Sequence, residues 1–221
     1  VLFITTISPF ETKTGSHQRT LHIYNALREK SDVSLICLTP DQPNPPENAR
    51  GNILFWGNKQ DIPAKTIKDV LFFWKKEFLH PKIQQWTEIV QSELKKAEYD
   101  IIFVRYLHNA IAVGVPLDNK VIIDADDLPE EHLRSAARSS TSSWLRKMYY
   151  RFAARIVRRH TRSIAKKCRI MLLANQNQCD FPGSAWLPNL PLPPPKNELK
   201  AEIPDSKDVF FVSLLSYPPN Y

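Results

Sequence analysis

The sequence predicts an α/β protein built on one open, doubly wound and mainly parallel sheet with helices on both faces. Short apolar runs such as residues 1–7 and 101–104 have the composition of buried strands. Helical patterns separate these runs, as crossovers between parallel strands require. The first 38 residues already read as strand, helix and strand, which implies a right-handed parallel connection.

The expected elements follow one another along the whole chain. A strand at 1–7 leads through a loop to a helix that Ser16 caps and that runs to about Lys30. Beyond it we expect strands at 32–38, 52–57, 101–104, 121–123, 170–174 and 185–189. Helices are expected over 65–96, with a break near Pro81, and over 132–167, with a break at 139–143.

Charge and cysteine content limit the class of protein. The 221 residues carry a net charge of +7, which favours an anionic partner such as a phosphate, a nucleic acid or an acidic membrane surface. Cys37, Cys168 and Cys179 are odd in number and lack C-x-x-C spacing, so we expect neither a disulfide framework nor a zinc site, and a reducing cytoplasm. No apolar run is long enough for a signal peptide or a membrane span.

The candidate ligand site follows from the predicted sheet, because doubly wound sheets bind ligands outside the carboxyl ends of their strands. Four segments leave those ends: residues 8–19, 105–109, 124–127 and 175–177. In the first, Gly15 would let a phosphate approach the backbone at a helix N-terminus, and Arg19 could pair with it. The alternative is a plain strand-to-helix turn with an exposed arginine.

The second segment places Arg105 and His108 at the exit of an apolar strand. Arg105 could meet an anion or a sugar hydroxyl, and His108 could serve as an acid, a base or a hydrogen-bond donor. The alternative is that Arg105 bridges to a neighbouring carboxylate while His108 caps a helix.

The third segment contributes Asp124, Asp126 and Asp127. These carboxylates could bind hydroxyls, bind a metal or orient a base, and those at 124 and 126 share a face if the strand continues. A metal site is the weaker interpretation, because no matching set of acids follows downstream. Asp127 could instead cap the next helix, with Glu130 at the capping-box position.

Residues 132–169 contain 12 Lys and Arg and no acid. Apolar residues at 144, 148, 152 and 156, with 145 and 149 beside them, predict a stripe that packs on the sheet. We expect the basic residues to point elsewhere and to form an anion or membrane patch, made of Arg146, Arg151, Arg155, Arg158 and Arg162. The alternative is an ordinary solvated face. Residues 69–86 alternate aromatics and lysines like an interfacial helix, although packing over the sheet edge would also explain them.

Several stretches, taken in order, resemble the amino-terminal half of a GT-B glycosyltransferase of the family 4 type. They are "SPFETKTGSHQRTLHIYNAL", "YDIIFVRYLHNA", "VIIDADD", the Arg-rich helix leading to "RIMLLANQNQCDF", "WLPNLP", and "DVFFVSLLSYPPN" near the end. The last is similar to the sequence that opens the second domain in that family. The resemblance implies a Rossmann-like acceptor domain over 1–188, a Pro-rich linker over 189–208, and the first strand and turn of a donor domain over 209–221. It also implies that the chain as given lacks most of that donor domain and is inactive alone.

The resemblance further implies a retaining transfer from a nucleotide sugar to a glycan or lipid-linked acceptor in polysaccharide biosynthesis. The nucleotide sugar is then a substrate, and no cofactor or metal is required. Gly15 would lie near the donor diphosphate and the acceptor, with Arg19 on the same loop–helix junction. Asp126 stands where many members have a catalytic histidine, and Ser213 where they have glycine. The implied location is cytoplasmic, at or near the inner face of the membrane.

Two other classes remain open from sequence. A nucleic-acid-binding module would use the basic helix on phosphates and bind with strong salt dependence, but no nucleic-acid-binding motif is present. A non-catalytic α/β binding domain is the second alternative. A glycan cleft requires the polar residues to gather at one edge of the sheet, which the structure can test.

Overall fold

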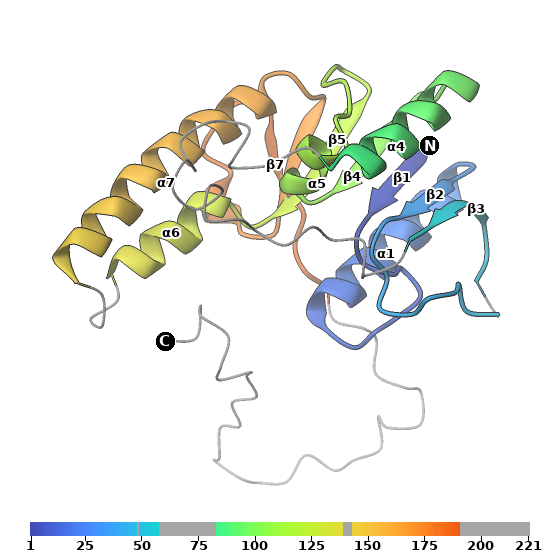
Figure 1. Cartoon of the computed structure of the whole chain (residues 1–221), viewed down its shortest axis with the longest axis horizontal. Helices are drawn as coiled ribbons and strands as arrows, with labels where there is room; N and C mark the ends of the chain where they lie inside the picture. Colours follow the sequence, from blue (N-terminus) through green and yellow to red (C-terminus); the bar gives the residue numbers. More distant parts are fainter. Residues whose placement is uncertain (48, 58–82, 139–142, 191–221) are drawn as a thin grey trace, which may run out of the picture.

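The structure is a computed structural model that describes residues 1–47, 49–57, 83–138 and 143–190. Within these ranges, seven strands form a single sheet in the order β3-β2-β1-β4-β5-β6-β7, and every neighbouring pair is parallel. The predicted α/β, doubly wound class is therefore confirmed (Figure 1).

The strands are β1 (Leu2–Thr5), β2 (Ser34–Cys37), β3 (Asn52–Trp56), β4 (Ile102–Arg105), β5 (Val121–Asp126), β6 (Ile170–Leu173) and β7 (Ser184–Trp186). Each falls on an apolar run that predicted a strand. β5 continues past Ile123 to Asp126, so two of the candidate acids belong to the strand itself. The register shifts between Asp124 and Asp126, which lets the strand bend at its carboxyl end.

The helices within the described ranges are α1 (Gly15–Lys30), α4 (Gln84–Lys96), α5 (Leu107–Ala112), α6 (Pro129–Arg138) and α7 (Trp144–Ala165), with a short 3-10 turn at Gln176–Gln178. Thr14, not Ser16, caps α1, because the Thr14 hydroxyl accepts a hydrogen bond from the His17 backbone N–H. The six-residue α5 was not predicted, since it is too short for a helical period to show.

The core has two layers, because successive strand residues point to opposite faces of the sheet. Phe3 and Phe103 face α1 and pack with Tyr24. Ile4 and Val104 face the other way and join the cluster that contains residues of α4, α5 and α7. Helices therefore cover both faces, as the sequence predicts.

Helices α6 and α7 pack against each other as a hairpin between β5 and β6 (Figure 1). One end of this hairpin lies beside the sheet and the other extends away from it. α6 leaves the carboxyl edge of the sheet after β5, and α7 returns to the amino edge before β6. The start of α7 therefore lies toward the carboxyl edge, the edge where a ligand is expected.

Several sequence-based expectations lie outside the described residues. They are the linker and donor-domain start from 191 onward, Ser213, and residues 69–82 of the second amphipathic segment. All three cysteines are described and none forms a disulfide. Cys37 is buried, and that burial raises the pKa of its thiol. None of the helices in the described ranges is long and apolar enough to cross a membrane.

Candidate functional site

The chain order reverses between β1 and β4, which are neighbours in the sheet although β2 and β3 separate them in sequence. Ligands of doubly wound sheets bind beside such a reversal. The two loops that leave these strands are joined there, since Asn109 Nδ2 donates to Thr6 Oγ1 at 3.1 Å and to the Arg105 carbonyl at 2.6 Å. Asn109 Oδ1 is buried and accepts no hydrogen bond from the described residues, so it can accept one from a ligand or water.

A polar crevice of about 210 Å³ opens at the carboxyl ends of β1 and β2. Hydroxyls, an imidazole and a carboxylate line it, from Thr6, Ser8, His17, Thr39 and Asp41, together with Ile7. Such groups donate and accept hydrogen bonds in the pattern that a sugar hydroxyl needs. The crevice is therefore a hydrophilic candidate site at the carboxyl edge of the sheet, between β1 and β2 and on one side of the reversal.

The N-terminus of α1 adjoins this crevice through His17. Thr14 Oγ1 lies 2.8 Å from His17 Nδ1, so the cap also orients the imidazole ring. A methyl group added at Gly15 would meet nothing within 4 Å. The first turn of α1 is thus open to an approaching group, and the positive end of the helix dipole favours an anion there. This is the position that the sequence predicts for Gly15.

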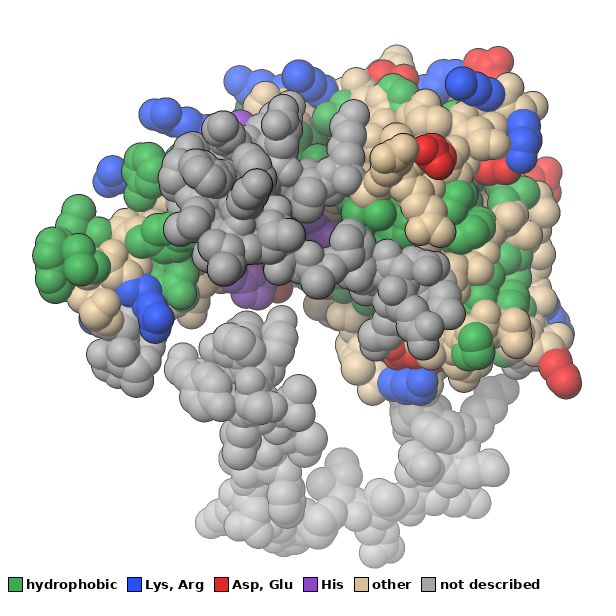
Figure 2. Space-filling view, in the orientation of Figure 1, with side chains coloured by type: hydrophobic (Ala, Val, Ile, Leu, Met, Phe, Trp, Pro, Cys, Tyr) green, Lys and Arg blue, Asp and Glu red, His purple; other side chains and the backbone are tan. Residues whose placement is uncertain are grey.

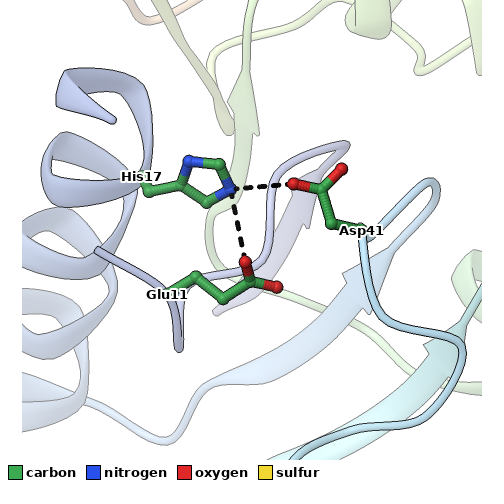
Figure 3. A group of neighbouring side chains, drawn as sticks. All are labelled: Glu11, His17 and Asp41. Atoms are coloured by element: carbon green, nitrogen blue, oxygen red, sulfur yellow. Dashed lines mark ion pairs between the residues drawn. The ribbon is translucent and has the colours of Figure 1, made fainter. Parts of the chain in front are cut away.

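Glu11, His17 and Asp41 form a cluster beside the crevice that sequence reasoning missed (Figure 3). His17 Nε2 lies 3.8 Å from Glu11 Oε2 and 3.6 Å from Asp41 Oδ2, and Figure 3 shows both carboxylates turned toward the ring. Lys13 Nζ pairs with Glu11 Oε2 at 2.6 Å. One ligand atom from each of the three residues lies within 4.8 Å of the others, so the cluster has the spacing of a divalent-cation site.

Beneath this surface, two arginines share the buried carboxylate of Asp124. Arg19 donates from Nε and Nη2 to Asp124 at 3.0 and 2.7 Å, and Arg105 Nη1 donates to Asp124 at 2.7 Å. Arg105 Nη2 also donates to Asp126 at 2.9 Å. Burial by itself disfavours the charged guanidinium, but Asp124, Tyr106 and Asp126 outweigh it and raise the pKa of Arg105. Each charged side chain of this network therefore has a hydrogen-bond partner of opposite charge.

This network corrects the expectation that Arg19, Arg105 and Asp124 meet a ligand directly. Arg105 and Asp124 are 0% exposed, and Arg19, which is 3% exposed, reaches only the wall of a separate and mainly apolar cavity. For Arg105 the alternative was right: it bridges to neighbouring carboxylates. Their role is to position the ends of β4 and β5, since two cations hold the carboxylates that would otherwise repel each other.

Asp126 is held differently from Asp124. Its side chain is 19% exposed, and its backbone has φ of 66°, in a region that non-glycine residues seldom adopt. Tyr106, at the end of the adjacent strand β4, also has a positive φ of 71°. Such conformations cost energy and persist where surrounding contacts enforce them, often at functional sites. Arg105 provides that enforcement, since it binds the Asp126 carboxylate and lies 4.1 Å from the Tyr106 ring centroid.

His108 and Asp127 lie at the same edge but on the outside. His108 is exposed on α5 and stacks on Tyr106 with ring centroids 5.3 Å apart. Asp127 is exposed and accepts a hydrogen bond from Gln178 Nε2 at 3.2 Å, which ties β5 to the turn after β6. Glu130 does not close a capping box with Asp127; it is buried against Arg162 instead.

The arginines predicted to form a basic patch on α7 fall into two groups in the structure. Arg146, Arg151 and Arg155 are exposed, as expected. Arg162 instead pairs with Glu130 at 3.0 Å and with Asp180 at 2.9 Å, and Arg158 lies 3.6 Å from Asp180. The apolar stripe at 144–152 was expected to pack on the sheet, and this is wrong: its side chains are exposed. The alanines and Val157 of the second half of α7 do the packing, because the first half extends beyond the sheet.

The residues that sequence reasoning missed share one property. Glu11 and Asp41 lie in loops after β1 and β2, and only the parallel pairing of these strands brings them to His17. Their position in the sequence could have indicated this cluster, because polar residues that closely follow adjacent apolar strands meet at one edge of a parallel sheet. No protein family, no curated protein and no solved structure matches this chain.

Proposed function

We propose that this chain is the acceptor-side domain of a GT-B glycosyltransferase of the family 4 type. The observation that carries the proposal is the polar crevice at the carboxyl ends of β1 and β2, with the open N-terminus of α1 next to it. A sugar offers hydroxyls to the crevice, and a nucleotide diphosphate offers charge to the helix end. The reaction transfers a sugar from the nucleotide to a glycan or lipid-linked acceptor.

The proposed division of labour follows from exposure. Gly15 leaves room for the donor diphosphate, which a second domain would bring across the cleft. Asp126 and His108 lie at the carboxyl ends of β4 and β5 and retain some exposure, so they are the groups that can orient the acceptor or accept its proton. Arg19, Arg105 and Asp124 position them from beneath. The transfer would retain the anomeric configuration and need no metal.

The test is a transfer assay with protein made from the complete coding sequence, a panel of nucleotide sugars, and glycan and polyprenyl-phosphate acceptors. Asp126→Asn and His108→Ala should each lower the rate by about 10²-fold or more, the usual contribution of an acid–base group. Asp32→Asn, at the opposite edge of the sheet, is the matched control and should leave the rate unchanged. Absence of transfer with every donor, or equal rates in all variants, would refute the proposal and favour a non-catalytic binding domain.

A further inference from the structure

The first half of α7 presents large apolar side chains to solvent. Trp144 is 67% exposed, and the others are Leu145 at 64%, Met148 at 58%, Phe152 at 56% and Tyr149 at 39%. These residues recur at helical spacing, so they form one continuous stripe about 12 Å long on the helix surface. Figure 2 shows hydrophobic side chains gathered at the outer end of the α6–α7 hairpin, with Lys and Arg beside them. The five residues are here termed the apolar stripe.

The apolar stripe lies on the side of α7 opposite its packing face. The buried residues of α7 are Ala153, Ala154, Val157, Thr161, Ile164 and Ala165. At about 3.6 residues per turn, this set centres nearly half a turn away from the stripe. A second apolar face therefore remains exposed on α7 after the helix has packed.

The charges around the stripe indicate what covers it. α7 contains seven Lys and Arg and no acid. Arg151 is exposed alongside the stripe and Arg155 is exposed less than one turn beyond Phe152, and neither forms an ion pair within the described ranges. A helix with aromatic and aliphatic residues on one face and unopposed cations beside them fits a lipid surface, where acyl chains lie beneath anionic headgroups.

We propose that the apolar stripe is a docking surface for an anionic lipid bilayer. The stripe enters the boundary between headgroups and acyl chains, and Arg151 and Arg155 contact lipid phosphates. α7 begins toward the carboxyl edge of the sheet, which is also the edge at which the polar crevice opens. This inference stands apart from the proposed transferase activity, because lipid docking needs neither donor nor acceptor.

Vesicle sedimentation with the 221-residue chain tests the proposal. We expect binding to phosphatidylcholine vesicles that contain phosphatidylglycerol, weaker binding as salt rises, and little binding to phosphatidylcholine alone. The double variant Leu145→Ser, Met148→Ser should bind about tenfold more weakly or worse, because it removes apolar surface from the lipid contact. Arg151→Ser with Arg155→Ser should give a comparable loss that disappears at high salt. Because all four residues are exposed, their circular dichroism should match wild type.

Leu190→Ser is the matched control, since Leu190 is 59% exposed but lies outside α7. It should bind vesicles as wild type does. Trp144 gives a direct signal: its fluorescence should be quenched by lipids brominated on the acyl chains, and Trp144→Phe should abolish that share of the quenching.

Three outcomes would overturn the proposal. They are equal binding to both vesicle types, unchanged binding by the Leu145→Ser, Met148→Ser variant, and preference for duplex DNA over anionic vesicles at matched salt. A dimer in solution that the same double variant dissociates, without vesicle binding, would assign the stripe to a second copy of the chain instead. None of these results depends on whether transferase activity is found.

Discussion

At the scale of single residues, the molecule separates groups that hold the site from groups that can touch a ligand. Arg105 is fully buried and binds Asp124 and Asp126, both at the carboxyl end of β5. Sequence reasoning identified these side chains and their edge of the sheet, because apolar strands end at them. It could not predict that Asp124 is buried, because Asp124 accepts a hydrogen bond from Arg19, which lies on a helix 105 residues earlier. Pairing over such a distance follows from topology and not from local pattern.

Removal of the Arg105 side chain should lower the stability of the folded protein. Arg105→Ala leaves two carboxylates, one of them fully buried, with fewer cations, and should reduce the free energy of unfolding by about 3–5 kcal/mol. Arg105→Lys should recover only part of this, because an ammonium cannot donate to both acids and Tyr106 with a planar fork. Urea unfolding followed by circular dichroism measures both variants. Equal stability of Arg105→Ala and wild type would contradict the structural role.

Substitution of Gly15, unlike that of Arg105, should leave the stability of the folded protein unchanged. A side chain there meets open space and the backbone needs no positive φ, so Gly15→Ala should unfold at the same urea concentration as wild type or slightly higher. Gly15→Leu should also fold, yet it should raise the KM for the nucleotide sugar if the diphosphate passes this point. The pair of measurements separates structure from function, because a stability loss in both variants would show that Gly15 serves the fold.

At the scale of elements, Arg162 joins α6 to α7 and also ties the α6–α7 hairpin to the segment that follows β6. Glu130 of α6 is 0% exposed and accepts from Arg162 of α7 at 3.0 Å, and Arg162 stacks on Phe181 at 3.8 Å. The sequence correctly predicted two helices with a break between 138 and 144. It misplaced the packing face of α7, because that helix carries two apolar faces and periodicity cannot tell which one meets the sheet.

Glu130 should make stability depend on pH. Burial raises the pKa of its carboxyl, although Arg162 opposes the shift. The folded state thus holds this proton to higher pH than the unfolded chain, and the stabilisation it provides is full below the ordinary pKa and lost as pH rises through the raised value. Glu130→Gln should remove this dependence when urea midpoints are compared at about pH 5 and about pH 8. Glu130→Ala should cost about 1–3 kcal/mol, because Thr161 and Arg162 lose an acceptor. A wild-type midpoint that rises over this range through Glu130 would contradict the sign.

At the scale of the whole molecule, one side chain joins the two halves of the sheet. Arg19 of α1 binds Asp124 of β5, and its Nη1 donates to the Leu187 carbonyl at 2.7 Å and to Asn189 Oδ1 at 2.9 Å. We therefore expect one cooperative unfolding transition for the described domain, with tryptophan fluorescence and circular dichroism coinciding. Arg19→Met should separate the two curves. Coincident curves in the variant would show that the strands alone couple the halves.

The contacts of Arg19 also determine the order in which the domain can fold during its synthesis. A ribosome releases α1 long before Asp124, and Leu187 and Asn189 emerge last among the residues that Arg19 binds. Until Asp124 emerges, β1 can pair with β2, but the guanidinium of Arg19 has none of its final acceptors and must stay hydrated; until Leu187 and Asn189 emerge, its Nη1 still lacks both of its own. The nascent chain should therefore resist proteolysis only after the segment beyond β7 has left the exit tunnel. Release of residues 187–189 from the tunnel is therefore the step at which Arg19 gains the last of these acceptors and the two halves of the sheet become joined.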